Sequence, residues 1–514
     1  MTLRHMIPVN PKVWLGAPFL IFLAACSGTA EPQVPTPAPT LERELPTQRP
    51  AKQASADELP DELATSYMYD LSSRDRDLGS AALEAVLDAQ DQRFVAVLIE
   101  VMRGIEVGMF LGTDYDTTVS GLETLSGESF GANWPAWVEW YGATDLTPPP
   151  GFTGWKGDVL TFIDPRFADF LRDDAPSKIR VEEIQWGGVS VDGIPALDNA
   201  PMVPADQADY LLPGEPVFGV AINGDARAYP LRIMDWHEMA NDVVGGVPMS
   251  LAYCTLCGAG IAFDGRASNG QTYDFGSSGF LYRSNKLMYD RQTRTLWNQL
   301  TGEPVLGELV EDNLELTLLP VVLTSWEDWL AQHPDTQVLE LETGFERYYL
   351  PGAAYGDYFS STSTMFPVWQ RGEQLDTKDR IYALRIDGTP KAYPLNDIIL
   401  EGVVNDQIGD TNVVLVANRG RVMVQGENRR VGQVIYDSGG EVRAFDRGDE
   451  VFAVTDDPDV VVDSQGRKWR VTEEALLGPD GETAPRINGH LAYWFGWFAF
   501  FPNTLVYGSD LGDG

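Results

Sequence analysis

The sequence predicts an α+β fold, with a small N-terminal α-helical, repeat-like module followed by two tandem homologous β-rich domains, the second of them degenerate. Three observations predict this fold. Apolar residues recur at helical spacing early in the chain, short β-rich runs bounded by Gly-containing turns follow, and one stretch of the β-rich part recurs farther along. The chain has 514 residues, 44% of them hydrophobic, which is enough for several globular units.

The charge of the chain limits its partners. Lys and Arg total 37 against 76 Asp and Glu, a formal net charge of -39. Because so acidic a chain repels a phosphate backbone, we expect no nucleic-acid partner. The acidity otherwise indicates solubility and names no partner.

Residues 1–25 are predicted to be a lipoprotein signal peptide. They contain Arg4 and Lys12, no acidic residue, and an apolar run at 13–25 that is too short to span a bilayer. The run ends in Leu23-Ala-Ala-Cys26, the pattern of small residues before a cysteine at which bacterial lipoproteins are cleaved and lipidated. We expect a lipid on Cys26 that anchors the chain to a membrane of the bacterial cell envelope, facing the periplasm or the exterior. An ordinary secretory signal is the alternative.

Residues 26–60 are predicted to form a disordered tether. Seven prolines lie among Thr, Ser, Gln and Glu, with almost nothing to bury. No later segment approaches the ~18 uninterrupted apolar residues of a membrane span, so the lipid would be the only anchor.

Residues 61–146 are predicted to form the α-helical module. Leu83, Val86 and Leu87 give a helical stripe, and a second apolar helix starts at Phe94. After the Pro-Pro-Pro-Gly sequence at 148–151 the pattern changes to short strands. We therefore place the first β-rich domain at 151–340, a Tyr-rich connector at 341–378, and the second β-rich domain at 379–510.

The β-rich part contains an internal repeat. Residues 218–231 match residues 382–395 at a constant offset of 164 (382 against 218), and Asn241-Asp242 matches Asn405-Asp406 at the same offset. Later pieces recur at shifted offsets, and we pair Tyr289-Asp290-Arg291 with Phe445-Asp446-Arg447 and Trp297 with Trp469. This repeat predicts two homologous β-rich domains.

The repeat separates residues of the scaffold from candidate site residues. Residues present in both copies are expected to determine the fold, because a copy can lose a site and keep its architecture. Residues present only in the first copy are candidates for a site, and they include His237, Cys254, Cys257 and His333, where the second has Glu401, Asn418, Arg421 and Phe501. We interpret the second domain as a copy that lost the chemistry.

Several motifs resemble a known family. They are Trp236-His-Glu-Met-Ala-Asn-Asp242, Tyr253-Cys-Thr-Leu-Cys-Gly258, the run at 275–291, Leu296-Trp-Asn-Gln299 and the stretch from Trp326 to His333-Pro334. On these motifs the sequence resembles the bacterial family called domain of unknown function 3179, closely over about 180–340 and more loosely over 380–510. The resemblance implies a secreted or lipid-anchored bacterial protein and brings no established activity.

The two remaining cysteines predict a metal site. A Cys254-x-x-Cys257 pair followed by Gly258 after an apolar strand is typical of a metal knuckle. His237 is the best third ligand, because the second copy lacks it. Two thiolates and an imidazole favour copper, and after it zinc, for metal handling or redox and electron transfer. Met288, His333 or an open position would complete the site.

The same cysteines allow two other interpretations. Their spacing is also that of thiol–disulfide oxidoreductases, and an oxidising compartment suits such chemistry. Alternatively they form a plain disulfide in a non-enzymatic scaffold or ligand-binding module, where so short a loop contributes little stability. The residues alone leave open whether the protein is an enzyme.

A polar group of residues accompanies the cysteines in the first domain. Arg283, Asn285, Lys286 and Glu238 are candidates for supporting a metal or binding an anion. The alternative is that Arg283 and Lys286 pair with Asp290 or nearby carboxylates. The His237-Glu238 sequence is not a zinc-protease helix, since Asn241 stands where the second histidine would be.

Overall fold

The computed structural model describes residues 58–109 and 114–509. The chain divides into two units at residues 52 and 53, and all described residues belong to the second unit. The predicted signal peptide, Cys26 and nearly all of the predicted tether lie outside the described residues. In the described part of the chain, no helix is both long and apolar enough to cross a bilayer.

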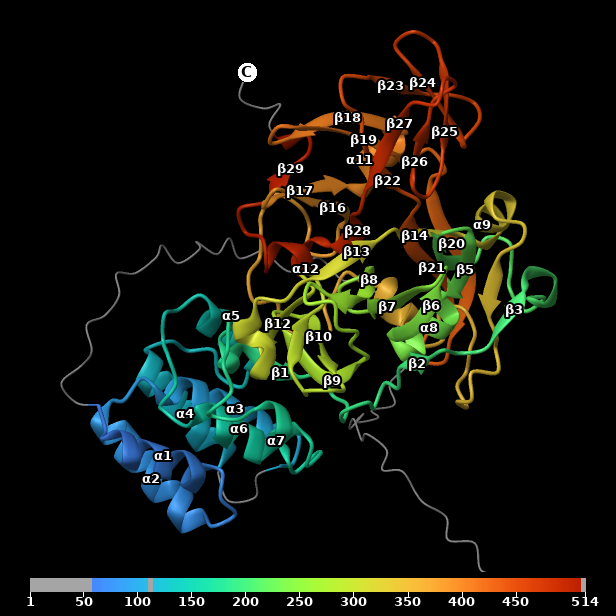
Figure 1. The fold of residues 1–514 in the computed structure, drawn as a ribbon. Helices are drawn as coiled ribbons and strands as arrows, with labels where there is room; N and C mark the ends of the chain where they lie inside the picture. The colour runs from blue at the N-terminus through green and yellow to red at the C-terminus, as the bar shows by residue number, and fades with distance from the viewer. Residues whose placement is uncertain (1–57, 110–113, 510–514) are drawn as a thin grey trace, which may run out of the picture. The chain divides into compact units, whose positions relative to one another are not determined.

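Helices form the N-terminal part of the described chain (Figure 1). Asp75 and Asp114 cap two of them by accepting hydrogen bonds from backbone N–H groups of the first turn, as a short polar side chain at a helix start does. The helices are α1 Asp61–Leu71, α2 Arg76–Ala89, α3 Phe94–Glu106, α4 Tyr115–Ser126, α5 Trp134–Gly142, α6 Phe152–Leu160 and α7 Phe167–Phe170.

The helical part extends beyond the predicted boundary at residue 146. Helices α6 and α7 follow the proline run, and their Trp155 and Phe170 are buried in the same core as α1 to α5. Gly151 stands at the start of α6 with φ 81°. The prolines therefore turn the chain between two helices of one core. That core continues into the first sheet through residues such as Phe280.

The first β-rich segment, residues 184–339, contains short strands and two helices. Its strands are β1 Ile184–Trp186, β2 Leu197–Asp198, β3 Met202–Pro204, β4 Pro216–Ile222, β5 Asp225–Pro230, β6 Met239–Val244, β7 Val247–Cys254, β8 Ala259–Ala267, β9 Phe275–Tyr282, β10 Asn285–Asp290, β11 Leu296–Asn298, β12 Glu303–Leu306, β13 Leu316–Leu319, β14 Val322–Ser325 and β15 Gln337–Leu339. Its helices are α8 Leu231–His237 and α9 Trp326–Gln332.

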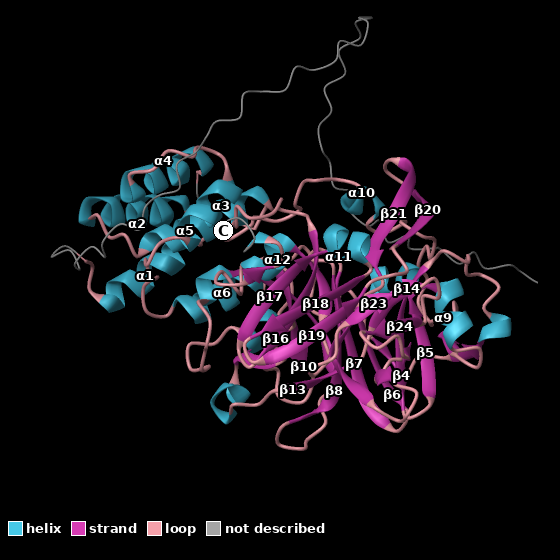
Figure 2. Cartoon of the chain, turned by 90° about the horizontal axis from the view of Figure 1, so that it is seen from above, coloured by secondary structure: helices cyan, strands magenta, loops and turns pink. Residues whose placement is uncertain are grey.

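The second β-rich segment, residues 380–506, follows a connector that holds α10 Gly356–Phe359. Its strands are β16 Arg380–Ile386, β17 Thr389–Pro394, β18 Val403–Ile408, β19 Thr411–Val416, β20 Arg421–Asn428, β21 Gly432–Gly440, β22 Arg443–Asp446, β23 Phe452–Val454, β24 Val460–Asp463, β25 Lys468–Val471, β26 Ala475–Leu477, β27 Thr483–Ile487, β28 His490–Tyr493 and β29 Leu505–Val506. Its helices are α11 Leu395–Glu401 and α12 Trp494–Phe498. Figure 2 shows α1 to α6 grouped apart from the strands, so the fold is an α+β arrangement.

The two β-rich segments contain sheets of the same strand order. The first has β14-β4-β5-β15, extended by β3, and the second has β28-β16-β17-β29. Their registers also agree, since Leu323 lies opposite Phe218 in the first sheet and Leu491 lies opposite Tyr382 in the second. In the four-strand order that both sheets share, the last pair (β5–β15 and β17–β29) is parallel and the other pairs are antiparallel, and β3 adds to β15 antiparallel.

Equivalent buried tyrosine and tryptophan side chains donate hydrogen bonds in both segments, because a buried donor needs an acceptor. In each segment a Tyr hydroxyl donates to an Asp at the next strand, and a Trp indole donates to an Asp. The pairs are Tyr229 with Asp242 (2.7 Å), Tyr393 with Asp406 (2.8 Å), Trp297 with Asp290 (2.9 Å) and Trp469 with Asp463 (2.9 Å).

The strand registers correct one pairing made from the sequence. Asp446 lies on β22 opposite Val413 of β19, just as Asp264 lies on β8 opposite Met249 of β7. The counterpart of Asp446 is therefore Asp264, and pairing it with Asp290 was wrong. Short Asp-Arg sequences recur by coincidence, whereas hydrogen-bonded registers fix the position of every residue on a strand.

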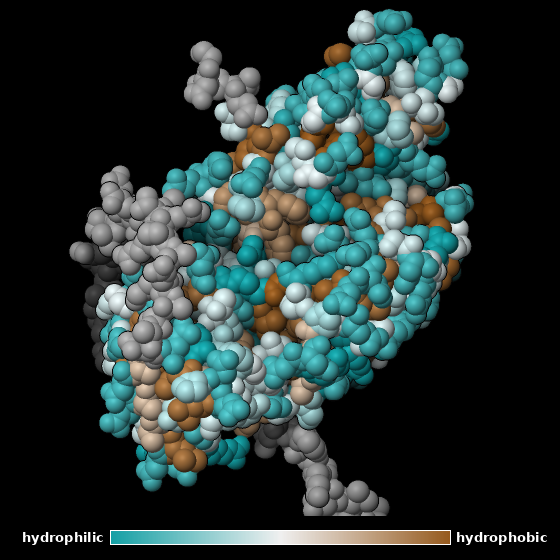
Figure 3. Space-filling view, turned by 60° about the vertical axis from the view of Figure 1, so that its left-hand side comes forward, coloured by the Kyte–Doolittle hydropathy of each residue, from teal (hydrophilic) through white to brown (hydrophobic). Residues whose placement is uncertain are grey.

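A cluster of buried charges, here called the Arg443 cluster, joins the two segments. Its members are Arg419, Glu441, Arg443 and Glu473 of the second segment, with Thr324, Asp328 and Gln332 of the first. Arg443 donates to Glu473 at 2.9 Å and Gln332 at 2.9 Å, and it also pairs with Glu441. Glu441 accepts from Thr324, and Arg419 pairs with Asp328 at 2.5 Å. Hydrophilic residues cover most of the face in Figure 3. In this cluster, by contrast, Glu441, Arg443 and Glu473 are buried.

Replacing Arg443 by methionine is expected to destabilise the protein strongly. The substitution leaves Glu441 and Glu473 buried with fewer cations, and breaking a buried ion pair costs about 3–5 kcal/mol. Urea denaturation of the full chain, followed by tryptophan fluorescence, measures the loss. The control is Arg430→Met, because the Arg430 side chain is 80% exposed and its single ion pair, with Asp357, should contribute less than about 1 kcal/mol. Equal denaturation midpoints for the two variants would contradict the role of the cluster.

Candidate functional site

The two cysteines lie in a tight turn between β7 and β8. Cys254 ends β7 and Cys257 precedes β8, and a disulfide joins them. Both residues are buried, with exposures of 2% and 0%. The Cys257 backbone N–H donates to the Cys254 sulfur at 3.4 Å. Gly258 follows with φ 65°, a left-handed conformation that glycine adopts at little cost.

His237 lies at the end of α8 with both ring nitrogens engaged. Nδ1 is 2.8 Å from the Pro195 carbonyl oxygen, and Nε2 is 2.5 Å from the Tyr349 hydroxyl. Burial lowers the pKa of His237 to about 4, so the ring is neutral. Nδ1 must then donate to the carbonyl, and Nε2, the remaining lone pair, accepts from Tyr349.

The predicted metal ligands do not form a ligand set in this oxidised state. Among residues 58–109 and 114–509, no group of three or more His, Cys, Asp and Glu side chains is placed to hold a metal ion. The lone pair of His237 is taken by Tyr349, and the two sulfurs are bonded to each other. Metal binding remains a prediction.

The two candidates for a fourth ligand lie in different surroundings. Met288 on β10 is buried in the same hydrophobic cluster as Cys254 and Cys257. His333 follows α9 and stacks on Trp329 with ring centroids 4.1 Å apart. Its counterpart, Phe501, stacks on Trp497 at 4.2 Å, so a ring at this place has a packing role in both segments.

Glu238 and Lys286 form a buried charged pair beside the cysteine turn. Lys286 Nζ is 3.3 Å from Glu238 Oε2, and both residues are buried. The other oxygen, Oε1, accepts a hydrogen bond of 3.1 Å from the hydroxyl of Thr255, which lies between the two cysteines. Burial lowers the pKa of Lys286, and the carboxylate of Glu238 opposes that shift. A buried pair of this kind is typical of functional sites.

The backbone of Glu238 is in a conformation that glycine would favour. Its φ is 56°, and the counterpart in the second segment is Gly402 with φ 72°. Both residues end a helix in the same way, and their carbonyls accept equivalent bonds, from Tyr253 N–H at 2.7 Å and Ala417 N–H at 2.8 Å. A non-glycine residue in this region costs about 1 kcal/mol or more. The first segment therefore has a glutamate at a position where the backbone conformation disfavours it.

Arg283 and Asn285 make structural contacts with α12 and the residue that follows it. Arg283 Nε donates to Glu183 at 2.7 Å and Nη1 to the Ala499 carbonyl at 2.9 Å. Asn285 Nδ2 donates to the Gly496 carbonyl at 2.8 Å. Arg283 and Lys286 therefore each pair with a buried carboxylate, as the alternative interpretation proposed, although Asp290 is the partner of neither.

Asp235 is a further buried acid that the sequence analysis did not single out. Tyr436 of the second segment donates to its Oδ2 at 2.8 Å, and Oδ1 has no hydrogen-bond partner among the described residues. Burial raises the pKa of Asp235 to about 8, so it is mostly protonated at neutral pH. Its counterpart in the repeat is Ile399. Comparing the full Asp-Trp-His-Glu sequence at 235–238 with Ile-Leu-Glu-Gly at 399–402 would have found it.

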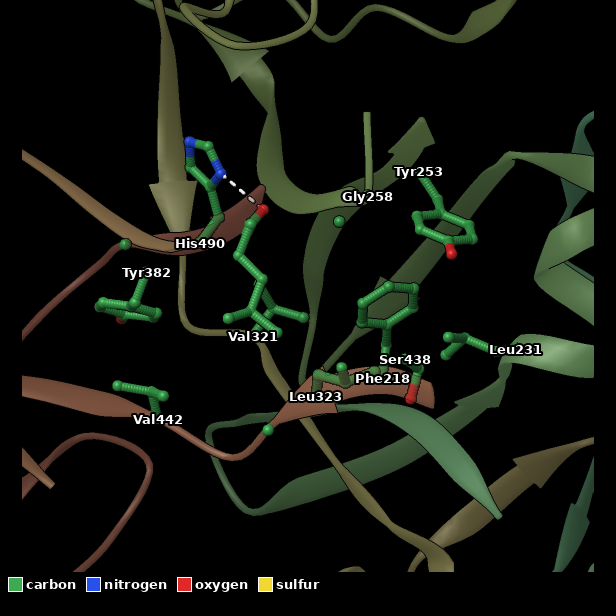
Figure 4. A pocket seen from close by; sticks show the side chains of 14 residues that line it. Phe218, Leu231, Tyr253, Gly258, Val321, Leu323, Tyr382, Ser438, Val442 and His490 are labelled. Carbon is green, nitrogen blue, oxygen red and sulfur yellow. Dashed lines mark hydrogen bonds between the residues drawn. The ribbon is translucent and has the colours of Figure 1, made fainter. Parts of the chain in front are cut away.

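A small cavity lies between the two β-rich segments, next to Gly258 (Figure 4). Its volume of about 20 Å³ fits one water molecule and no organic substrate. The Tyr382 hydroxyl in its wall has no hydrogen-bond partner among the described residues. A wider hollow of about 450 Å³ lies beside α6 and is lined by residues such as Phe152 and Arg180, none of them near the cysteines in sequence.

Replacing Asp235 by asparagine is expected to stabilise the protein increasingly as pH rises. The unfolded chain releases the Asp235 proton near the ordinary pKa of 3.8, whereas the folded chain holds it up to about pH 8. The folded state therefore loses stability relative to the unfolded state between about pH 4 and pH 8, and asparagine removes that loss. The gain should grow by on the order of 1 kcal/mol per pH unit. Urea denaturation from pH 5 to pH 8 measures it, and parallel curves for the two proteins would contradict it.

Comparison with known proteins supports the resemblance found in the sequence. A family model described as "Protein of unknown function (DUF3179)" matches residues 191–504, more than half of the chain and both β-rich segments. No curated protein and no solved structure matches.

Proposed function

The chain belongs to this family of unknown function, and we propose that its Cys254–Cys257 pair is a thiol–disulfide redox centre in a lipid-anchored protein of the bacterial cell envelope. The lipid would be carried by Cys26. We further propose that the two β-rich segments are tandem copies of one domain. The equal strand orders, equal registers and equivalent buried hydrogen bonds support the duplication.

The observation that carries the redox proposal is the placement of Glu238. The fold itself favours glycine at this position, as Gly402 illustrates, so the glutamate side chain is kept for another reason. Its carboxylate is bonded to Thr255 within the cysteine turn and paired with Lys286. A carboxylate and an ammonium held beside a disulfide are groups that can take and give the protons of thiol chemistry.

The reaction proceeds by two exchanges with a dithiol reductant. A reductant thiolate attacks the pair, the S–S bond breaks, and one cysteine leaves as a thiolate that takes up a proton. The second reductant thiol then loses its proton and attacks the mixed disulfide, which releases the other cysteine and forms the reductant's disulfide. The Cys257 N–H bond to sulfur favours Cys254 as the leaving thiolate, and Lys286 and Glu238 exchange the protons.

Reduction of the native protein tests this proposal. Incubation with dithiothreitol should expose two new thiols per chain while circular dichroism shows the fold retained. Glu238→Gln and Lys286→Met should slow the reduction by about 100-fold, in the range of general acid–base contributions. Lys391→Met is the matched control, because Lys391 is also a buried lysine and forms an ion pair with Asp406 at 2.7 Å in the second segment.

The control variant should react at the wild-type rate. Thiols that appear only when the protein unfolds would indicate a structural disulfide in a scaffold or ligand-binding module, and would overturn the proposal. Reduction of both the Glu238 and the Lys286 variant at the rate of the Lys391 variant would remove Glu238 and Lys286 from the mechanism.

A second candidate function is binding of copper, ahead of zinc, by the reduced pair. The observation that favours it is the burial of Met288 in one cluster with both cysteines, since thiolates and a thioether suit Cu(I). His237 could join them if Nε2 gave up its hydrogen bond from Tyr349.

Metal content of the reduced protein tests the second candidate. After anaerobic reduction, one Cu(I) per chain should survive gel filtration, and Cys254→Ser should abolish binding. Met288→Leu should weaken copper more than zinc, whereas Met249→Leu, a buried methionine in a different cluster, should change neither. Loss of metal in His237→Ala would add His237 to the ligands. A reduced protein that retains neither metal would overturn metal binding.

A further inference from the structure

The cysteine turn is held from outside the first segment. The Tyr493 backbone N–H of the second segment donates to the Cys257 carbonyl at 2.7 Å. The Tyr358 hydroxyl of the connector donates to the Leu256 carbonyl at 2.6 Å. Two consecutive carbonyls of the turn are therefore fixed by residues about 100 or more positions away in the chain.

Gly496 of α12 lies directly on Cys257. A Cβ at Gly496 would stand 2.8 Å from the Cys257 Cβ, closer than Cβ atoms approach, and 3.2 Å from Asn285 Oδ1, which is a tight contact. Its backbone φ is not positive, so conformation does not demand glycine. The counterpart of Gly496 on α9 of the first segment is Asp328, which shows that the helix itself accepts a side chain here. Contact with the cysteine turn is the reason for the glycine.

Gly258 receives a similar close contact. A Cβ there would stand 3.1 Å from Arg380 Nη1 and 3.2 Å from the Tyr493 ring. Arg380 lies over that ring at 4.5 Å and donates to the Tyr493 hydroxyl at 3.0 Å, so the two side chains form one fixed wall. The second segment thus covers the turn on the Gly258 side as well.

We propose that the second β-rich segment, with Tyr358 of the connector, completes the redox site by holding the Cys254–Cys257 turn in the geometry that favours the disulfide. This inference rests on the proposed redox function. The second segment, which has no cysteines among its residues 380–506, would thus have the role of positioning those of the first segment. Tyr358, Tyr493 and Gly496 are positioning residues, because they act through the turn and not on a reactant.

The physical reason is the narrow geometry of a disulfide. A disulfide requires the Cβ atoms of its two cysteines to lie within a narrow range of separations. Two free thiols impose no such requirement. Contacts that hold the turn still therefore stabilise the disulfide more than the dithiol. Loosening them should make the pair easier to reduce without any change at the sulfurs.

The equilibrium between the full-length protein and dithiothreitol tests the inference. Gly496→Ala should shift the equilibrium constant at least about tenfold toward the dithiol. Tyr358→Phe removes one hydrogen bond to the turn and should shift it a few-fold in the same direction, which corresponds to the net worth of a hydrogen bond of about 1 kcal/mol. If the Gly496→Ala variant does not fold, the equilibrium constant of the Tyr358→Phe variant tests the inference by itself.

Two matched variants control for general effects on the second segment. Tyr393→Phe also removes a buried tyrosine hydrogen bond, to Asp406 at 2.8 Å. Gly478→Ala also introduces a Cβ at 2.8 Å from another atom, Glu482 Oε2. Both should keep the wild-type equilibrium constant. Constants unchanged in Tyr358→Phe and Gly496→Ala would overturn this inference alone, whereas a wild-type disulfide that no reductant opens in the native state would overturn the redox function itself.

Discussion

The two β-rich segments share two hydrophobic clusters, and the buried polar groups within this contact constrain how the segments pack on each other. A buried donor or acceptor without a partner costs more than a hydrogen bond gains, so each must meet its partner across the contact. Arg443 meets Gln332, Tyr436 meets Asp235, and the Tyr493 N–H meets the Cys257 carbonyl. These directional bonds leave little freedom in how one segment packs on the other.

The same scaffold surrounds different chemistry in each segment. Register places Arg443 of β22 where the first segment has Ile261 on β8, since they lie opposite Val416 and Ala252 respectively. The first segment has an apolar interior there and a cysteine turn with Glu238 and Lys286. The second segment lacks the cysteines and has instead a buried cluster of charges. The interior of the second segment is therefore polar at this place, which a comparison restricted to cysteine and histidine does not reveal.

Local sequence patterns predicted much of the fold because they act through near neighbours. Helical spacing of apolar residues located α2 and α3, and the repeat matched two stretches that form equivalent hairpins, β4 with β5 and β16 with β17. Helices α6 and α7 lie beyond the predicted boundary at residue 146, and the pairing of Asp290 with Asp446 was wrong. The boundary and the pairing rested on short sequence features, whereas burial of Trp155 and the hydrogen-bonded registers depend on contacts distant in the chain.

The sequence by itself determined the family, the helical start of the described chain, the repeat and the candidate residues Cys254, Cys257, Lys286 and Glu238. Only the tertiary structure decided how these residues meet. In the structure a disulfide joins the two sulfurs, and the lone pair of His237 accepts a hydrogen bond from Tyr349. Lys286 forms an ion pair with Glu238. The tertiary structure also brought Gly496 onto Cys257 from a segment more than 200 residues away. The sequence shows which reactive and charged side chains are present. Which of them become partners depends on how buried donors and acceptors pack in the folded chain.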